Sequence, residues 1–180
     1  MDELNRKSVS AFKSADKAPI AVVLDNVRSM HNVGSVFRTA DAFLIEGIAL
    51  CGYTPQPPHR DIQKTALGAT ETVAWKYYAS TMEAVQFYKE QGYNIWAIEQ
   101  VDNSISLDSI TTEILFNTFD TKKIAVVFGN EVSGVDDVIL PLCNGSIEIP
   151  QSGMKHSLNI SVAAGIVLWE LAKKVRSYLP

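Results

Sequence analysis

Runs of apolar residues that alternate with amphipathic segments are the feature that most constrains how this 180-residue chain folds. The main runs are IAVVLD at 20–25, GIALCG at 47–52, NIWAIE at 94–99 and KIAVVFG at 123–129, and shorter candidates are TVAWKYY at 72–78 and SIEIP at 146–150. Continuous apolar runs rich in β-branched residues indicate strands that are covered on both faces. Their alternation with helices predicts an α/β fold, with a mainly parallel sheet and helices on both faces.

Helical periodicity is clearest in three segments, 32–44, 80–92 and 157–176. Asn32 is the predicted N-cap of the first segment, with Val33 and Phe37 on its apolar side. Ser80 and Glu83 form a predicted capping box at the start of the second. The Pro-rich segment 52–60 is predicted to be a loop, because its composition suits neither a helix nor a strand.

The overall composition limits the class of protein. Residues 1–18 form a polar arm, and we expect a single domain over residues 19–180. There is neither a run of roughly 20 apolar residues, as a membrane helix needs, nor the apolar region of a secretory signal. We therefore expect a cytoplasmic protein with no membrane segment, whose Cys51 and Cys143 stay reduced. These cysteines lack the spaced partners of a zinc site, so we predict no metal.

Ligands of parallel α/β sheets collect where the strands end, so the loops that follow the predicted strands are the candidate site. The first of these loops leads into the helix at 32–44, where Ser35, Arg38 and Asp41 share the side opposite Val33 and Phe37. This side is either functional or a solvated face with an Arg38–Asp41 surface pair. The Gly-x-Gly-x-x-Gly pattern of a dinucleotide site is missing, which disfavours a doubly wound oxidoreductase.

Two further loops are rich in glycine or in polar side chains. In GNEVSGV, at 129–135, the glycines allow tight turns around Glu131, although a plain strand-to-helix turn has the same composition. In HSLNIS, at 156–161, a single N-cap needs either Ser157 or Asn159, and Ser161 adds a third polar group. The surplus of polar groups suggests a ligand in addition to capping.

Three motifs in this order resemble those of the SpoU (TrmH-like) branch of the SPOUT RNA methyltransferases. They are N-x-G-x-x-x-R (Asn32, Gly34, Arg38), GNEVSG (129–134) and IPQSG followed by SLNIS (149–161). The resemblance runs from about residue 19 to the last helix. Gln151 departs from it, because many members carry methionine after the Ile-Pro pair.

The resemblance implies a fold, a cofactor and a reaction. The C-terminal part is expected to form a deep trefoil knot that binds S-adenosylmethionine, through the backbone at Gly129, Ile149 and Leu158. The family methylates a ribose 2′-hydroxyl in RNA and works as a homodimer. Arg38 matches its essential arginine, which acts across the dimer interface.

The catalytic set implied by the resemblance is Arg38, Asn32, Glu131, Ser157 and Asn159. Arginine keeps its proton in proteins, so we expect Arg38 to anchor the target phosphate and stabilise the forming oxyanion rather than act as a base. The other four residues would position Arg38 and the ribose.

The substrate implied by the resemblance is RNA, although the net charge of −4 does not by itself indicate a nucleic-acid binder. Several basic residues flank the predicted site loops, namely Arg28, Arg38, His59, Arg60, Lys64, Lys155 and His156. We expect tRNA, since only an 18-residue arm precedes the domain. The alternatives are the same chemistry on rRNA, and a non-catalytic knotted RNA-binding protein.

Overall fold

The computed structural model describes residues 7–116, 122–154 and 157–178, whose strands form one parallel sheet. The strand order is β3-β2-β1-β6-β4-β7-β5. The bounds are β1 Ala18–Asp25, β2 Ile45–Cys51, β3 Ala74–Tyr78, β4 Asn94–Ile98, β5 Ile105–Ser106, β6 Ile124–Phe128 and β7 Gly145–Glu148. Because all paired strands are parallel, their carboxyl ends meet at one edge of the sheet.

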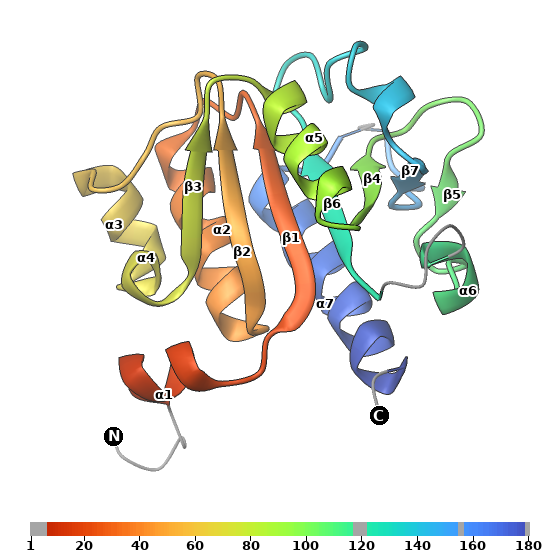
Figure 1. The fold of residues 1–180 in the computed structure, drawn as a ribbon. Coiled ribbons are helices and arrows are strands. Elements are labelled where there is room, and N and C mark those ends of the chain that lie inside the picture. The colour runs from red at the N-terminus through yellow and green to blue at the C-terminus, as the bar shows by residue number, and fades with distance from the viewer. Residues whose placement is uncertain (1–6, 117–121, 155–156, 179–180) are drawn as a thin grey trace.

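Helices cover both faces of this sheet, as predicted. Figure 1 shows α5 on one face, with α2 and α7 on the other. The helix bounds are α1 Val9–Ser14, α2 Met30–Ala42, α3 Arg60–Ala66, α4 Ala69–Thr72, α5 Thr81–Glu90, α6 Thr112–Leu115 and α7 Ile160–Tyr178, with a 3₁₀ turn at Leu140–Leu142.

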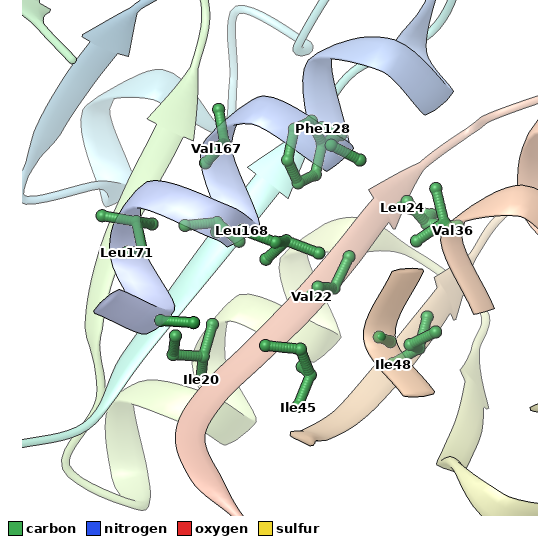
Figure 2. Close-up of a cluster of buried hydrophobic side chains, with 14 of the residues drawn as sticks. Ile20, Val22, Leu24, Val36, Ile45, Ile48, Phe128, Val167, Leu168 and Leu171 are labelled. Atoms are coloured by element: carbon green, nitrogen blue, oxygen red, sulfur yellow. The ribbon is translucent and has the colours of Figure 1, made fainter. Parts of the chain in front are cut away.

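The central strand β1 is buried on both faces, which explains its uninterrupted apolar sequence. Ile20, Val22 and Leu24 point into the cluster formed with α2 and α7 (Figure 2). Ala21 and Val23 point into the second cluster, on the side of α5. Full burial of one such aliphatic side chain stabilises the fold by roughly 1.5–3 kcal/mol, so this strand fixes the frame on which the loops stand.

Two predicted helix starts are wrong. Helix α2 begins at Met30, because the Ser29 hydroxyl accepts from the Asn32 N–H at 3.2 Å and is the true N-cap. Helix α7 begins at Ile160 rather than at Ser157, with the Asn159 side chain accepting from the Ser161 N–H at 2.9 Å. In both segments a neighbouring polar residue competed for the cap, and sequence spacing does not decide between them.

Some shorter elements were not predicted from the sequence at all. The segment after the Pro-rich loop contains α3 and α4, and the predicted polar arm contains α1, whose Phe12 is buried. The boundary at residues 18 and 19 stays a prediction, as does the knot. The chain that would be threaded includes residues 155 and 156, which lie outside the described part.

Candidate active site

A cavity of about 520 Å³ opens at the carboxyl ends of β4, β6 and β7. Its walls come from four separate chain segments, which lie within residues 98–100, 128–134, 147–151 and 157–163. This is the position at which open parallel sheets bind their ligands, since the loops that follow the strands are free to vary there.

The predicted cofactor residues Gly129, Ile149 and Leu158 all line this cavity. The predicted catalytic residues Glu131, Ser157 and Asn159 line it as well. The structure thus brings residues from two of the three motifs to one place, while the roles assigned to them remain predictions.

Gly129 cannot carry a side chain, because the loop folds back over it. A Cβ there would lie 2.0 Å from the carbonyl carbon of Gly134 and 2.1 Å from the nitrogen of Val135. The turn is closed by two backbone hydrogen bonds between Asn130 and Gly134, at 2.8 and 2.9 Å. Gly134 has a φ of +71°, which is strained for other residues. The glycines of this motif therefore shape the cavity wall.

Glu131 joins this loop to the start of α2. Its carboxylate accepts from the Arg28 N–H at 3.1 Å, from the Ser29 N–H at 3.2 Å and from the Asn32 side-chain amide at 3.0 Å. Burial raises the pKa of Glu131, but hydrogen bonds from the Arg28 N–H, its own N–H, the Asn32 amide and the Ser29 N–H together hold it below its usual value. Asn32 is itself buried, so the structure places it as a positioning partner of Glu131.

The hydrogen bonds at the start of α7 show which of its polar residues take part in capping the helix. The Asn159 side chain accepts from both the N–H and the hydroxyl of Ser161, at 2.9 and 2.6 Å. One cap therefore involves two of the three polar residues. Ser157 is not part of this cap and lines the cavity with its side chain exposed.

Arg38 lies on α2 with its side chain exposed, as the sequence spacing predicted. It is not among the described residues that line the cavity of its own chain. The Asp41 carboxylate accepts from the Thr72 hydroxyl at 2.5 Å, and the ion pairs found between described residues do not include Arg38 with Asp41. The surface-pair explanation of this face therefore has no support.

The cavity is acidic, a feature that the sequence reasoning missed. Glu99 and Glu148 line it together with Glu131, and its described lining residues include no lysine or arginine. Such a wall suits a cationic ligand and disfavours a polyphosphate such as NAD or ATP. Glu99 could have been found from its position at the end of the predicted strand 94–99, whereas Glu148 fell inside the predicted strand 146–150 and only the observed end of β7 places it at the edge.

The described residues bear on two expectations from the sequence, namely that there is no metal site and no membrane segment. In that part of the chain, no group of three or more histidine, cysteine and acidic side chains is placed to hold a metal ion. None of its helices is long and apolar enough to span a membrane.

The fold and the cavity together define an α/β domain with a ligand-sized, acidic cavity at the carboxyl edge of a parallel sheet. The model of the SpoU rRNA Methylase family matches residues 19–169. The chain belongs to this family, and the resemblance drawn from the three motifs is confirmed.

Relatives of known activity include enzymes for both kinds of RNA. The tRNA (guanosine(18)-2′-O)-methyltransferase of Thermus thermophilus is 30% identical over 96% of this chain and 84% of its own length. The 23S rRNA (guanosine-2′-O-)-methyltransferase RlmB of Vibrio vulnificus is 28% identical over 96% of this chain and 66% of its own.

Solved structures agree with the predicted fold class. The TrmH/SpoU tRNA modifying enzyme of A. aeolicus has a TM-score of 0.77 at 25% identity, covering 93% of this chain and 80% of its own. The AdoMet-bound rRNA methyltransferase of Sinorhizobium meliloti has a TM-score of 0.76 at 26% identity, covering 97% and 62%.

Proposed function

We propose that this SpoU-family chain, which transfers a methyl group from S-adenosylmethionine to a ribose 2′-hydroxyl of RNA, acts on tRNA. The observation that carries the proposal is the acidic cavity of about 520 Å³, lined by residues of the second and third motifs. The choice of tRNA is supported by the Thermus thermophilus enzyme, which is matched over 84% of its length against 66% for the rRNA enzyme. We propose a cytoplasmic location on the same ground, since tRNA is abundant there.

The cavity fits the cofactor by charge and by shape. S-adenosylmethionine supplies a methyl group on a positively charged sulfur. The backbone at Gly129, Ile149 and Leu158 would hold it, and the three glutamates would favour its positive charge. Gly129 lets the loop fold back on itself, which shapes the wall beside which the cofactor would lie.

The remaining groups position the RNA and stabilise charge. Arg38 would bind the phosphate of the target nucleotide and stabilise the oxyanion that forms as the 2′-hydroxyl loses its proton. Glu131 and Asn32 hold the start of α2, and so hold the helix that carries Arg38. Ser157 and Asn159 stand at the cavity wall, where they would position the ribose.

A homodimer is part of the same proposal, because Arg38 does not line the cavity of its own chain in the described residues. A stripe of exposed apolar side chains begins at Leu158, just before α7, and continues along that helix with Val162, Ile166 and Trp169, at 39–59% exposure. A Cβ built at Gly165 would meet no described atom within 4 Å, so another helix could approach closely there. An isologous dimer over this stripe would bring the partner's α2 towards the cavity.

The test of substrate is incubation with S-adenosylmethionine labelled in its methyl group, using purified tRNA and purified rRNA in parallel. We expect label in tRNA, on one ribose that mapping by alkaline hydrolysis identifies. Label in rRNA alone would contradict the choice of tRNA and support rRNA as the substrate. Binding of the cofactor without methylation of either RNA would support a non-catalytic RNA-binding protein.

The test of assembly uses sedimentation and complementation. Ile166→Glu on the α7 stripe should give a monomer with little activity, whereas Val9→Glu, also on an exposed side chain, should stay dimeric. Mixing Arg38→Ala with Ala163→Phe, which fills the cavity, should restore roughly a quarter of the sites if the partner supplies Arg38. A fully active monomer, or no restoration in proven mixed dimers, would contradict the proposal.

A further inference from the structure

A second cavity of about 490 Å³ lies at the same edge of the sheet, on the side of α5. We call it the tyrosine pocket; the lining residues that matter here are Asn26, Tyr53, Tyr77, Met82, Asp136 and Val138. Its volume falls within the roughly 300–1,000 Å³ typical of ligand pockets. None of the three motifs accounts for it.

Tyr53 projects from a backbone that is fixed in place. Its side chain is 81% exposed, yet its N–H donates to the Asn26 side chain at 3.0 Å. The next residue, Thr54, is buried and its hydroxyl donates to the Leu24 carbonyl at 3.0 Å. On the other side, the Gly52 N–H donates to the Tyr78 carbonyl at 3.1 Å. Because the backbone is already fixed, a base that stacks on this ring costs only the freedom of the side chain's own torsions.

Three further lining side chains, Tyr77, Met82 and Val138, are largely apolar and partly exposed. Tyr77 is 40% exposed, and its hydroxyl donates to the Gly52 carbonyl at 3.3 Å. Met82 and Val138 are 50% and 57% exposed. Two aromatic rings with apolar neighbours suit a flat, weakly polar ring system. The carboxylate of Asp136 would repel a phosphate inside the pocket, but can accept from the amino or imino group of a base.

The tyrosine pocket and the cofactor cavity are lined by the same loop. The loop after β6 lines the cofactor cavity with Asn130 and the tyrosine pocket with Asp136. The Asn130 amide donates to the Asn26 carbonyl at 2.7 Å, and the Asp136 N–H donates to the Asp25 carboxylate at 3.0 Å. Both sites therefore border the same loop, which these hydrogen bonds hold against the end of β1.

We propose that the tyrosine pocket binds an unpaired base of the RNA substrate, near the nucleotide whose ribose is methylated. The proposal rests on the proposed RNA substrate and gives that substrate a local requirement, namely an unstacked base beside the target. Stacking on aromatic side chains is the usual way in which proteins hold such bases.

The kinetic experiment compares Tyr53→Ala with the wild type in methylation of tRNA. The KM for RNA should rise roughly 5- to 150-fold, the range that loss of one base–aromatic stack gives, while the Kd for S-adenosylmethionine stays unchanged. Tyr53→Phe keeps the ring and should stay near the wild type. Leu67→Ala removes a side chain that is 65% exposed but outside the pocket, and serves as the matched control. An unchanged KM in Tyr53→Ala would overturn the proposal.

A second readout does not depend on catalysis. The ring resonances of Tyr53 and Tyr77 in the wild type should shift when a short single-stranded oligoribonucleotide is added, and those of Tyr93, buried outside the pocket, should not. If the wild type methylates no RNA, the proposed function fails while shifts of Tyr53 and Tyr77 would still support the pocket. An absence of shifts at saturating RNA would overturn the pocket whether or not methylation occurs.

Discussion

Helices α2 and α7 both begin beside the cofactor cavity, yet their first turns find their hydrogen-bond partners in different places. At α2, Ser29 caps the helix and Glu131, about a hundred residues further along the chain, accepts from three donors at its start. At α7, the Asn159 side chain accepts from Ser161, two residues away. Asn32 is buried, whereas Ser157, Leu158 and Asn159 are exposed.

The difference indicates which helix start is already held by contacts within the chain and which is not. The start of α2 is completed by tertiary contacts, so Arg38 stands on a rigid base. The start of α7 is left for a ligand or a partner to cover. The two regions should therefore respond differently to mutation, to cofactor and to pH.

The largest expected effect comes from Arg38, on the exposed side of the rigid helix. Arg38→Ala should lower single-turnover methylation by roughly two to three orders of magnitude, because the charge that stabilises the forming oxyanion is lost. The Kd for S-adenosylmethionine and the melting temperature should stay near those of the wild type. Arg38→Lys should recover only part of the rate, since a point charge does not reproduce a bidentate phosphate contact. Normal methylation by Arg38→Ala would rule out the proposed mechanism.

The next largest effect should be a difference between the two helix starts in how far cofactor binding slows their amide hydrogen exchange. At a concentration 100 times the Kd, S-adenosylmethionine should slow amide hydrogen exchange at residues 157–161 by up to about 100-fold, since opening there would require its release. Amides at residues 29, 32 and 33 should change little, because their N–H groups already donate to partners within the chain. Hydrogen exchange with mass spectrometry measures both segments in one sample. Equal protection of both would contradict the comparison.

The Glu131 contact should make the start of α2 sensitive to acid. Because its folded-state pKa is lowered, the carboxylate stabilises the fold above pH 4.5, its ordinary pKa, and this contribution is lost as the pH falls through the lower folded value. Glu131→Gln removes it. The difference in unfolding free energy between wild type and variant, roughly 1 kcal/mol at neutral pH for a solvent-exposed group, should therefore shrink on acidification. Urea unfolding at pH 7 and below pH 4 checks this, and a difference that grows towards low pH would reverse the sign.

The smallest effect should come from the cap of α7. Asn159→Ala should cost about 1 kcal/mol of stability, or about 2–4 °C in Tm for a chain of this size. Asn159→Asp, which can still accept from Ser161, is the control and should keep most of that stability. Thermal melting without cofactor measures it. A loss several times larger would mean that the start of α7 is more tightly packed than its exposure indicates.

Much of this architecture could be read from the sequence. The apolar runs located β1, β2, β4 and β6, because strands that are buried on both faces have nearly continuous apolar sequences that are easy to recognise. The rule that parallel strands end at one edge singled out the loops that contain Glu131 and Asn159, and the family resemblance implied Gly129, Ile149 and Leu158. Helices α3 and α4 escaped prediction, since they are short and lack an extended apolar periodicity.

The sequence by itself determined the class of fold, the edge of the sheet that carries the site and the family of RNA methyltransferases to which the chain belongs. These depend on local periodicity and on short motifs, which can be recognised without knowledge of the contacts between distant residues. Only the tertiary structure decided that α2 begins at Met30 with Ser29 as its cap, where Glu131 accepts from the Ser29 N–H and from the Asn32 amide. It also decided that Glu99 and Glu148 make the cavity acidic and that Tyr53 stands on a fixed turn, since each depends on contacts between segments far apart in the chain.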